Sequence, residues 1–286
     1  LDYDRAIKTE YEIDCMNRAN RRAAAGHRAV ARALRDGISE FELHLRYCEA
    51  AGLSDEGLPY PSIIGLNEHA AILHYQRRDT SAPARTVSLL IDAGAEDQAY
   101  AADVTRTYAL DDEPFSALID AMDVLQREVC ANTTAGTDFV ALNELAHQRL
   151  AQVLSDFDLI TCSAETAWDH GVTTAFLPHG LGHLLGLQVH DVGGHSVERQ
   201  AGRRNPPQRH PFLRLTRTLE ADMVVTIEPG IYFIEQLIDA LDRDKPGILR
   251  RATAQRFMKF GGIRIEDDLR VKSRGHENLT RSAFGE

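Results

Sequence analysis

The chain has 286 residues, of which 43% are hydrophobic, enough for one large core or for two domains that share an interface. Its formal net charge is −11, from 43 acidic against 32 basic residues. This balance leaves no broad basic surface, so we expect no nucleic-acid partner. The first twelve residues are highly charged, and no run of about 18 apolar residues occurs, which argues against a secretory signal and a membrane span.

Four cysteines, Cys15, Cys48, Cys130 and Cys162, lie far apart and form no Cys-x-x-Cys pair. This spacing suggests neither a disulfide framework nor a thiolate zinc site. We therefore expect the protein to work in the reducing cytoplasm.

Two helices are predicted at the start of the chain. Thr9 and Glu12 have the spacing of a capping box, and the alanine-rich stretch that follows should be helical to about Leu34. Ser39 and Glu42 repeat the pattern before a second helix, which should end near Gly52.

Apolar runs bounded by turn residues predict buried strands at residues 62–65, 87–91 and 104–108. Two amphipathic helices should follow, at residues 115–130 and 138–154, and two further strands at 224–227 and 263–265. The proline- and arginine-rich residues 199–211 should form an irregular loop. This order of elements predicts an α+β fold in one compact unit.

Residues 179–195 are rich in glycine and histidine, a composition that is unfavourable for a core helix, because each glycine costs about 1 kcal/mol there. His179 and His183 have the i, i+4 spacing of a zinc-binding pair on a helix, but the glycines at 180 and 182 argue against a helix. We interpret the segment as part of a site, and we assign no function to other histidines such as His27, His44 and His147.

Four acidic residues, Asp92, Asp103, Glu228 and Glu266, stand at the ends of apolar strand-like segments. One such carboxylate would ordinarily be a turn former or a hydrogen-bonded side chain. Four together would repel one another and become protonated unless cations balanced them. Their convergence therefore predicts two divalent metal ions, and oxygen ligands with one imidazole suit Mn²⁺, Co²⁺ or Fe²⁺ at least as well as Zn²⁺.

The chain resembles the Xaa-Pro dipeptidases, or prolidases, of the pita-bread metallopeptidase superfamily, which also contains aminopeptidase P, methionine aminopeptidase and creatinase. The resemblance is carried by ordered matches along nearly the whole chain. They are residues 7–13, Leu73-His74-Tyr75, Ile91-Asp92-Ala93-Gly94, Asp103-Val104-Thr105-Arg106-Thr107, His179-Gly180-Leu181-Gly182-His183, Val189-His190-Asp191, residues 227–232 and Arg264-Ile265-Glu266-Asp267.

The resemblance implies a pita-bread catalytic domain over residues 1–286, with a pseudo-symmetric curved antiparallel sheet flanked by helices. It also implies five metal ligands, Asp92, Asp103, His183, Glu228 and Glu266, with Mn²⁺ as the expected metal. His74, His179 and His190 match histidines that line the pocket, and Arg214 matches an arginine that binds the substrate carboxylate. The family's N-terminal domain, which contributes to dimerisation, is not expected in this chain, and a homodimer is left open.

The expected reaction is hydrolysis of an Xaa-Pro dipeptide by a hydroxide that bridges the two metals. His74 or His190 would stabilise the oxyanion, Glu228 would carry a proton to the leaving nitrogen, and His179 and Arg214 would bind substrate. Aminopeptidase P-like cleavage of longer peptides is the alternative, although residues 233–260 resemble the prolidase branch more. A metal-free creatinase-like reaction and a non-catalytic module are less favoured, because all five ligand types are present.

Overall fold

The computed structural model describes residues 1–199 and 202–286. A short helix α1 (Asp2–Arg5) precedes α2 (Glu10–Ala33) and α3 (Glu40–Ala51). Both predicted capping boxes are present, with Thr9 before α2 and Ser39 before α3. Gly52 ends α3 with a φ of 66°, a conformation that glycine adopts without steric cost.

The first half of the fold contains a three-stranded antiparallel sheet in the order β1-β2-β5. Its strands are β1 (Ile63–Leu66), β2 (Ser88–Asp92) and β5 (Thr105–Ala109). A two-stranded ribbon of β3 (Glu96–Asp97) and β4 (Tyr100–Ala101) connects β2 to β5. The three predicted strands are thus confirmed, with ends that differ by one residue.

Three helices lead into the second half: α4 (Glu113–Ala131), α5 (Phe139–Asp156) and α6 (Ala164–Asp169). Asp112 and Asp138 accept hydrogen bonds from the first turns of α4 and α5 and so act as N-caps. Short 3₁₀ helices in the described residues are η1 (Leu34–Asp36), η2 (Asp55–Gly57), η3 (Asn67–Ala71) and η4 (Val172–Ala175).

The second half contains an antiparallel sheet in the order β10-β9-β6. Its strands are β6 (Val224–Ile227), β9 (Asp267–Val271) and β10 (His276–Asn278), followed by α9 (Leu279–Phe284). A further pair is formed by β7 (Gly230–Tyr232) and β8 (Gly262–Arg264).

Residues 233–260 form α7 (Glu235–Asp244) and α8 (Arg251–Met258) between the paired strands β7 and β8. Tyr232 lies opposite Gly262 in this pair, so the segment leaves and re-enters the sheet at the same place. Phe260 stacks on Phe115 of α4 with a ring-centroid distance of 4.1 Å, which fastens the end of the segment to the core.

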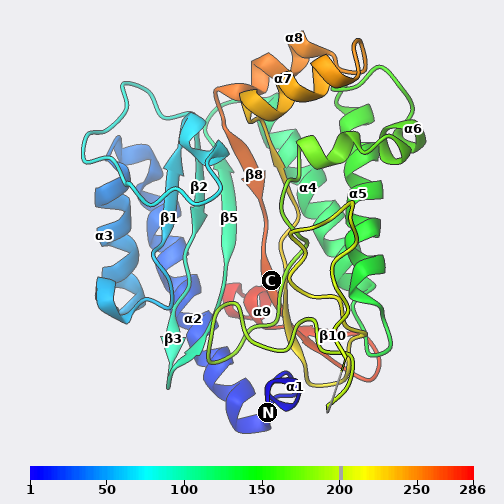
Figure 1. The fold of residues 1–286 in the computed structure, drawn as a ribbon. Coiled ribbons are helices and arrows are strands. Elements are labelled where there is room, and N and C mark those ends of the chain that lie inside the picture. Colours follow the sequence, from blue (N-terminus) through cyan, green and yellow to red (C-terminus); the bar gives the residue numbers. More distant parts are fainter. Residues whose placement is uncertain (200–201) are drawn as a thin grey trace.

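The two half-sheets meet in the middle of the molecule through a β-bridge between Thr105 and Glu266. Figure 1 shows α2 and α3 beside the first half, α4 and α5 beside the second, and α7 and α8 across one end. All strand pairs of the described residues are antiparallel, and the expected α+β arrangement of a sheet flanked by helices is confirmed.

Between η4 and β6 the described residues contain isolated β-bridges but no helix or strand, as expected for the loop at 199–211. Residues 200 and 201 of that predicted loop lie outside the described residues. Among the helices of the described chain, none combines the length and apolar character needed to span a bilayer.

Candidate metal centre

The five residues expected to bind metal line the same cavity, although they come from both halves of the fold. Asp92 is the last residue of β2, and Asp103 lies just before β5. Glu228 stands between β6 and β7, and Glu266 between β8 and β9, while His183 lies in the long irregular segment between η4 and β6. The carboxylates at the strand ends therefore converge on one cavity, as predicted from the sequence.

Short distances connect the donors. His183 Nε2 lies 3.3 Å from Asp103 Oδ2 and 3.5 Å from Glu228 Oε1. Single donor atoms of Asp103, His183 and Glu266 all lie within 4.8 Å of one another, close enough to share one ion. The other ring nitrogen of His183, Nδ1, lies 3.0 Å from Leu184 O, an arrangement that directs Nε2 into the cavity.

Glycine allows His183 to reach this position. A Cβ atom at residue 182 would lie 2.1 Å from the carbonyl oxygen of Thr226 on β6, so only glycine lets the two backbones approach so closely. The His183 amide then donates to Thr226 Oγ1 at 3.0 Å. The glycine-flanked histidine of the sequence thus lies in extended backbone against a strand, and the helical zinc-pair alternative is wrong.

The carboxylates of the cavity carry more negative charge than their neighbours balance. Burial, reinforced by the nearby acids, raises the pKa of Glu266 well above its ordinary value. Burial likewise raises the pKa of Glu228 to about 7 and raises that of Asp92. Asp103 differs: burial is the largest single influence and opposes ionisation, but the hydrogen bond and charge of His183, together with the Tyr60 hydroxyl, outweigh it and lower the pKa of Asp103.

This donor set fits divalent cations. Four carboxylates and one imidazole face a common space, and the positive charges beside them come from Arg264 and from His183 when it is protonated. Gathering carboxylates without enough counter-charge is unfavourable, and bound cations remove that cost. Oxygen donors with a single imidazole nitrogen are the ligands that Mn²⁺, Fe²⁺, Co²⁺ and Zn²⁺ all accept.

The cavity has a volume of about 630 Å³ and also contains the four other residues predicted from the sequence, His74, His179, His190 and Arg214. The ring of His190 packs edge-on against His183, with centroids 4.5 Å apart. His179 Nε2 lies 2.9 Å from the Tyr232 hydroxyl, and burial lowers the pKa of His179 to about 3, so this ring is neutral.

Arg214 is exposed on the cavity wall. Within the described residues, no hydrogen bond or ion pair of the Arg214 guanidinium group is found. A cationic group held at the cavity without an acidic partner is available to an anionic ligand.

Two residues that were not predicted, Tyr60 and Arg264, contact the acidic cluster, and a third, Tyr232, contacts Arg264. The Tyr60 hydroxyl lies 2.7 Å from Asp92 Oδ1 and 2.5 Å from Asp103 Oδ1. Arg264 donates to Asp92 and to the Tyr232 hydroxyl. Arg264 and Tyr232 belong to motifs recognised in the sequence. The excess of carboxylates over cations in those motifs was a signal that a cationic residue such as Arg264 would lie beside the acids. Tyr60 lies between two prolines, outside every motif.

Comparison with known proteins defines the class of this site. A model of metallopeptidase family M24 matches residues 14–273, which include all nine predicted site residues. The chain belongs to metallopeptidase family M24, a class of hydrolases that depend on divalent metal ions.

Curated relatives carry a more particular name. The chain is 49% identical over 286 residues to the Xaa-Pro dipeptidase of Xanthomonas campestris pv. campestris (strain B100), which covers 99% of this chain and 65% of that protein. It is 46% identical over 282 residues to the Xaa-Pro dipeptidase of Shewanella sp. (strain W3-18-1), covering 98% of this chain and 64% of the relative. The chain thus spans slightly less than two thirds of the length of these relatives.

Solved structures of aminopeptidase P have the same fold. Zinc-substituted Escherichia coli aminopeptidase P in complex with product matches with a TM-score of 0.78 and 26% identity, over 98% of this chain and 57% of that one. Proline aminopeptidase P II from Yersinia pestis matches with a TM-score of 0.78 and 28% identity, over 99% of this chain and 58% of that one. The pita-bread fold expected from the sequence is thereby confirmed.

Proposed function

We propose that this chain is the catalytic part of a dinuclear metal hydrolase that cleaves Xaa-Pro dipeptides. The observation that carries the proposal is the convergence of four carboxylates, one imidazole and the Arg214 guanidinium group on one cavity of about 630 Å³. The names of the relatives, which are 46% to 49% identical, support the same substrate class.

Asp92, Asp103, His183, Glu228 and Glu266 would hold two divalent cations. When bound, the cations lower the pKa of a water molecule and polarise the scissile carbonyl. We propose Mn²⁺ as the ion because the donor set consists mostly of carboxylate oxygens. The cytoplasm remains the proposed location, and the four unpaired cysteines are consistent with it.

The remaining cavity residues would act on the substrate directly. His190 and His74 lie on the cavity wall, where an imidazole N–H can donate to the developing oxyanion. Glu228, whose Oε1 also accepts from Thr226 Oγ1 at 3.3 Å, would carry a proton towards the leaving proline nitrogen. His179, held by Tyr232, would contact the substrate backbone.

Arg214 would bind the carboxylate at the end of the dipeptide. A guanidinium group can donate two parallel hydrogen bonds to a carboxylate, which fixes its distance from the scissile bond. A tripeptide places an amide there instead of a carboxylate. This difference separates a dipeptidase from an enzyme that removes the first residue of longer peptides, the aminopeptidase P-like alternative.

The test compares Ala-Pro with Ala-Pro-Ala, using wild type and Arg214→Ala loaded with Mn²⁺. We expect wild type to prefer Ala-Pro, and Arg214→Ala to lose about 100-fold in kcat/KM on Ala-Pro, corresponding to about 2 to 3 kcal/mol for a charge-assisted pair. Equal turnover of both peptides by wild type would favour the aminopeptidase P-like alternative. An unchanged KM for Ala-Pro in Arg214→Ala would reject the carboxylate clamp.

A further inference from the structure

The candidate metal centre spans the line where the two half-sheets meet. Asp92 and Asp103 belong to the first half, and Glu228 and Glu266 to the second. At this junction the Glu266 amide donates to Thr105 O at 3.1 Å. The distance between the two acidic pairs therefore depends on how firmly the half-sheets are held together.

On the cavity side, neutral hydroxyl groups cross the junction. Thr105 Oγ1 donates to Glu266 Oε2 at 2.6 Å, and Thr107 Oγ1 donates to Arg264 O at 3.0 Å. Successive side chains of a strand point to opposite faces, so Arg106 and Asp267 lie on the back of the sheet. Both residues belong to recognised sequence motifs, yet the proposed reaction gives neither a function.

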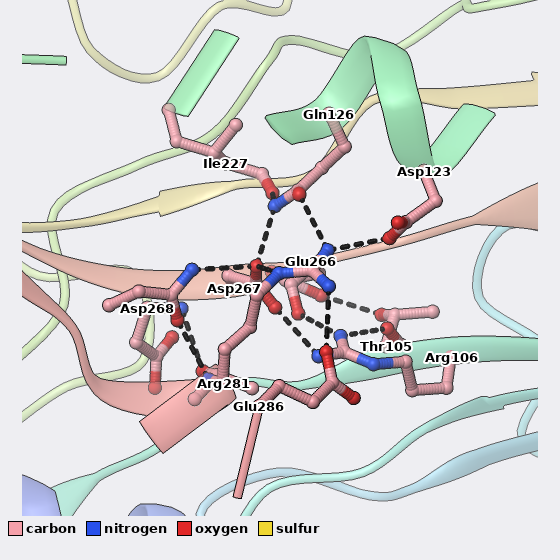
Figure 2. Close-up of polar contacts among 12 residues, drawn as sticks. Thr105, Arg106, Asp123, Gln126, Ile227, Glu266, Asp267, Asp268, Arg281 and Glu286 are labelled. Atoms are coloured by element: carbon pink, nitrogen blue, oxygen red, sulfur yellow. Dashed lines mark hydrogen bonds and ion pairs between the residues drawn. The ribbon is translucent and has the colours of Figure 1, made fainter. Parts of the chain in front are cut away.

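Arg106 and Asp267 form a buried ion pair across the junction, as Figure 2 shows. Arg106 Nη2 lies 2.8 Å from Asp267 Oδ1, and Asp267 is fully buried. The second terminal nitrogen of Arg106 donates to Thr105 O at 2.9 Å and to Glu266 O at 2.8 Å. The guanidinium group of Arg106 thus binds the backbone of both residues of the β-bridge, Thr105 and Glu266, as well as the carboxylate of Asp267.

Asp267 extends the contact to the strand that ends at Glu228. Gln126 of α4 donates to Asp267 Oδ2 at 3.0 Å and to Ile227 O at 3.3 Å. Ile227 lies opposite Asp267 in the β6–β9 pair. Arg281 of α9 completes the group, with its Nε 2.7 Å from Asp267 Oδ2 (Figure 2). Gln126 therefore connects the backbone next to Glu228 to the buried Asp267 carboxylate, and Arg106 connects the backbone of Glu266 to the same carboxylate.

We propose that the Arg106–Asp267 pair, with Gln126, is a lock between the half-sheets that sets the affinity of the metal centre. These residues are positioning residues, because they touch the backbone of the ligand-bearing segments and no reacting atom. The inference rests on the proposed metal site. Partners that orient metal ligands from behind typically change metal affinity by about 10- to 100-fold when they are removed.

The experiment measures Mn²⁺ binding to the metal-free full chain by isothermal titration calorimetry, together with unfolding in urea. The variants are Asp267→Asn, which removes the charge, and Gln126→Met, which removes the contacts to Asp267, Ile227 and Arg281 without changing the charge. Arg270→Gln is the matched control, since Arg270 is a buried arginine of the same strand β9 that pairs with Glu10 and Asp222, away from the cavity.

We expect Asp267→Asn and Gln126→Met to bind Mn²⁺ about 10- to 100-fold more weakly. Arg270→Gln should lose stability and keep wild-type affinity. If Asp267→Asn does not fold, Gln126→Met decides alone. Wild-type affinity in the folded Gln126→Met, or an equal loss of affinity in Arg270→Gln, would overturn the lock. A wild-type chain that binds no Mn²⁺ would instead reject the proposed function on which the lock rests.

Discussion

Two neighbouring carboxylates, Glu266 and Asp267, have almost the same burial and opposite electrostatic surroundings. Their exposed fractions are 2% and 0%. Glu266 faces the cavity, where burial and other acids raise its pKa well above the ordinary value. Asp267 faces the back of the sheet, where Arg106 and Arg281 outweigh the effect of burial and lower its pKa. The strand places them on opposite faces because side chains alternate.

The difference shows how one sheet can both bind metal and stay folded. On the back face, the buried Asp267 is paired with two arginines and an amide donor of the chain, so its charge is balanced without a ligand. On the cavity face, Asp92, Asp103, Glu228 and Glu266 exceed the cations around them. That excess is unfavourable electrostatic free energy, which binding of divalent ions at the proposed site would relieve.

The largest effect on activity is expected on the cavity face of the sheet, where the carboxylates outnumber the cations. Replacing Glu266 with Gln keeps the shape of the side chain but removes a proposed metal ligand, so we expect loss of at least one of the two proposed Mn²⁺ ions. Activity on Ala-Pro should fall at least about 1,000-fold, since several kcal/mol of charge stabilisation are lost. Metal content by mass spectrometry and kcat on Ala-Pro are the measurements.

Stability distinguishes this variant from a misfolded one. In the metal-free state, Glu266→Gln should be at least as stable as wild type, because a repelling carboxylate becomes neutral. Mn²⁺ at 100 times its Kd should stabilise wild type by about 2.7 kcal/mol per site, and the variant by less. The exposed Glu235→Gln, at the start of α7, serves as control. A metal-free variant that unfolds well below wild type would contradict the account.

An intermediate effect is expected at a second balanced acid, Asp191. Lys8 Nζ lies 3.1 Å from Asp191 Oδ2, and both side chains are almost completely buried. Lys8→Met leaves Asp191 with Arg5 as its cation. We expect a loss of about 3 kcal/mol in the free energy of unfolding, because a buried charge loses a partner. Urea unfolding of the metal-free chain measures it. A loss below about 1 kcal/mol would mean that water reaches the pair.

The smallest effect should occur where charges are paired in water. Arg35 and Asp111 form an ion pair of 3.1 Å, with side chains that are 67% and 71% exposed. Arg35→Ala should change the free energy of unfolding by less than about 1 kcal/mol, because the solvent already screens both charges. The same urea titration measures this change. A change as large as that of Lys8→Met would show that burial does not determine how much an ion pair contributes to stability.

Local sequence rules predicted most of the fold. The capping boxes at Thr9 and Ser39 fixed the starts of α2 and α3, because the signal lies within four residues. Strand cores were predicted from short apolar runs, with ends displaced by one residue or so. The division into separate half-sheets was not predicted, since strand pairing depends on residues far apart in the sequence.

In the candidate site, too, residues within short motifs could be predicted, and contacts that depend on tertiary packing could not. Asp92, Asp103, His183, Glu228 and Glu266 could be predicted to converge because each lies in a motif. Their metal-binding role, like the substrate roles of His74, His179, His190 and Arg214, stays a prediction. Tyr60 could not be found in this way, since its contacts with Asp92 and Asp103 arise from tertiary packing. The same is true of the pair of Lys8 and Asp191, which are 183 residues apart.

The position of α7 and α8 has a consequence for engineering. Because Tyr232 and Gly262 face each other across β7 and β8, the 29 or so residues around these helices close a loop whose ends already meet. We therefore expect that the turn at residues 245–247 between the two helices can be extended without displacing Glu228 or Glu266, because the segment itself stays attached through Ile238, Leu241, Leu249 and Phe257, which are buried in the core. It offers a place to attach a reporter or an affinity module while the cavity stays intact.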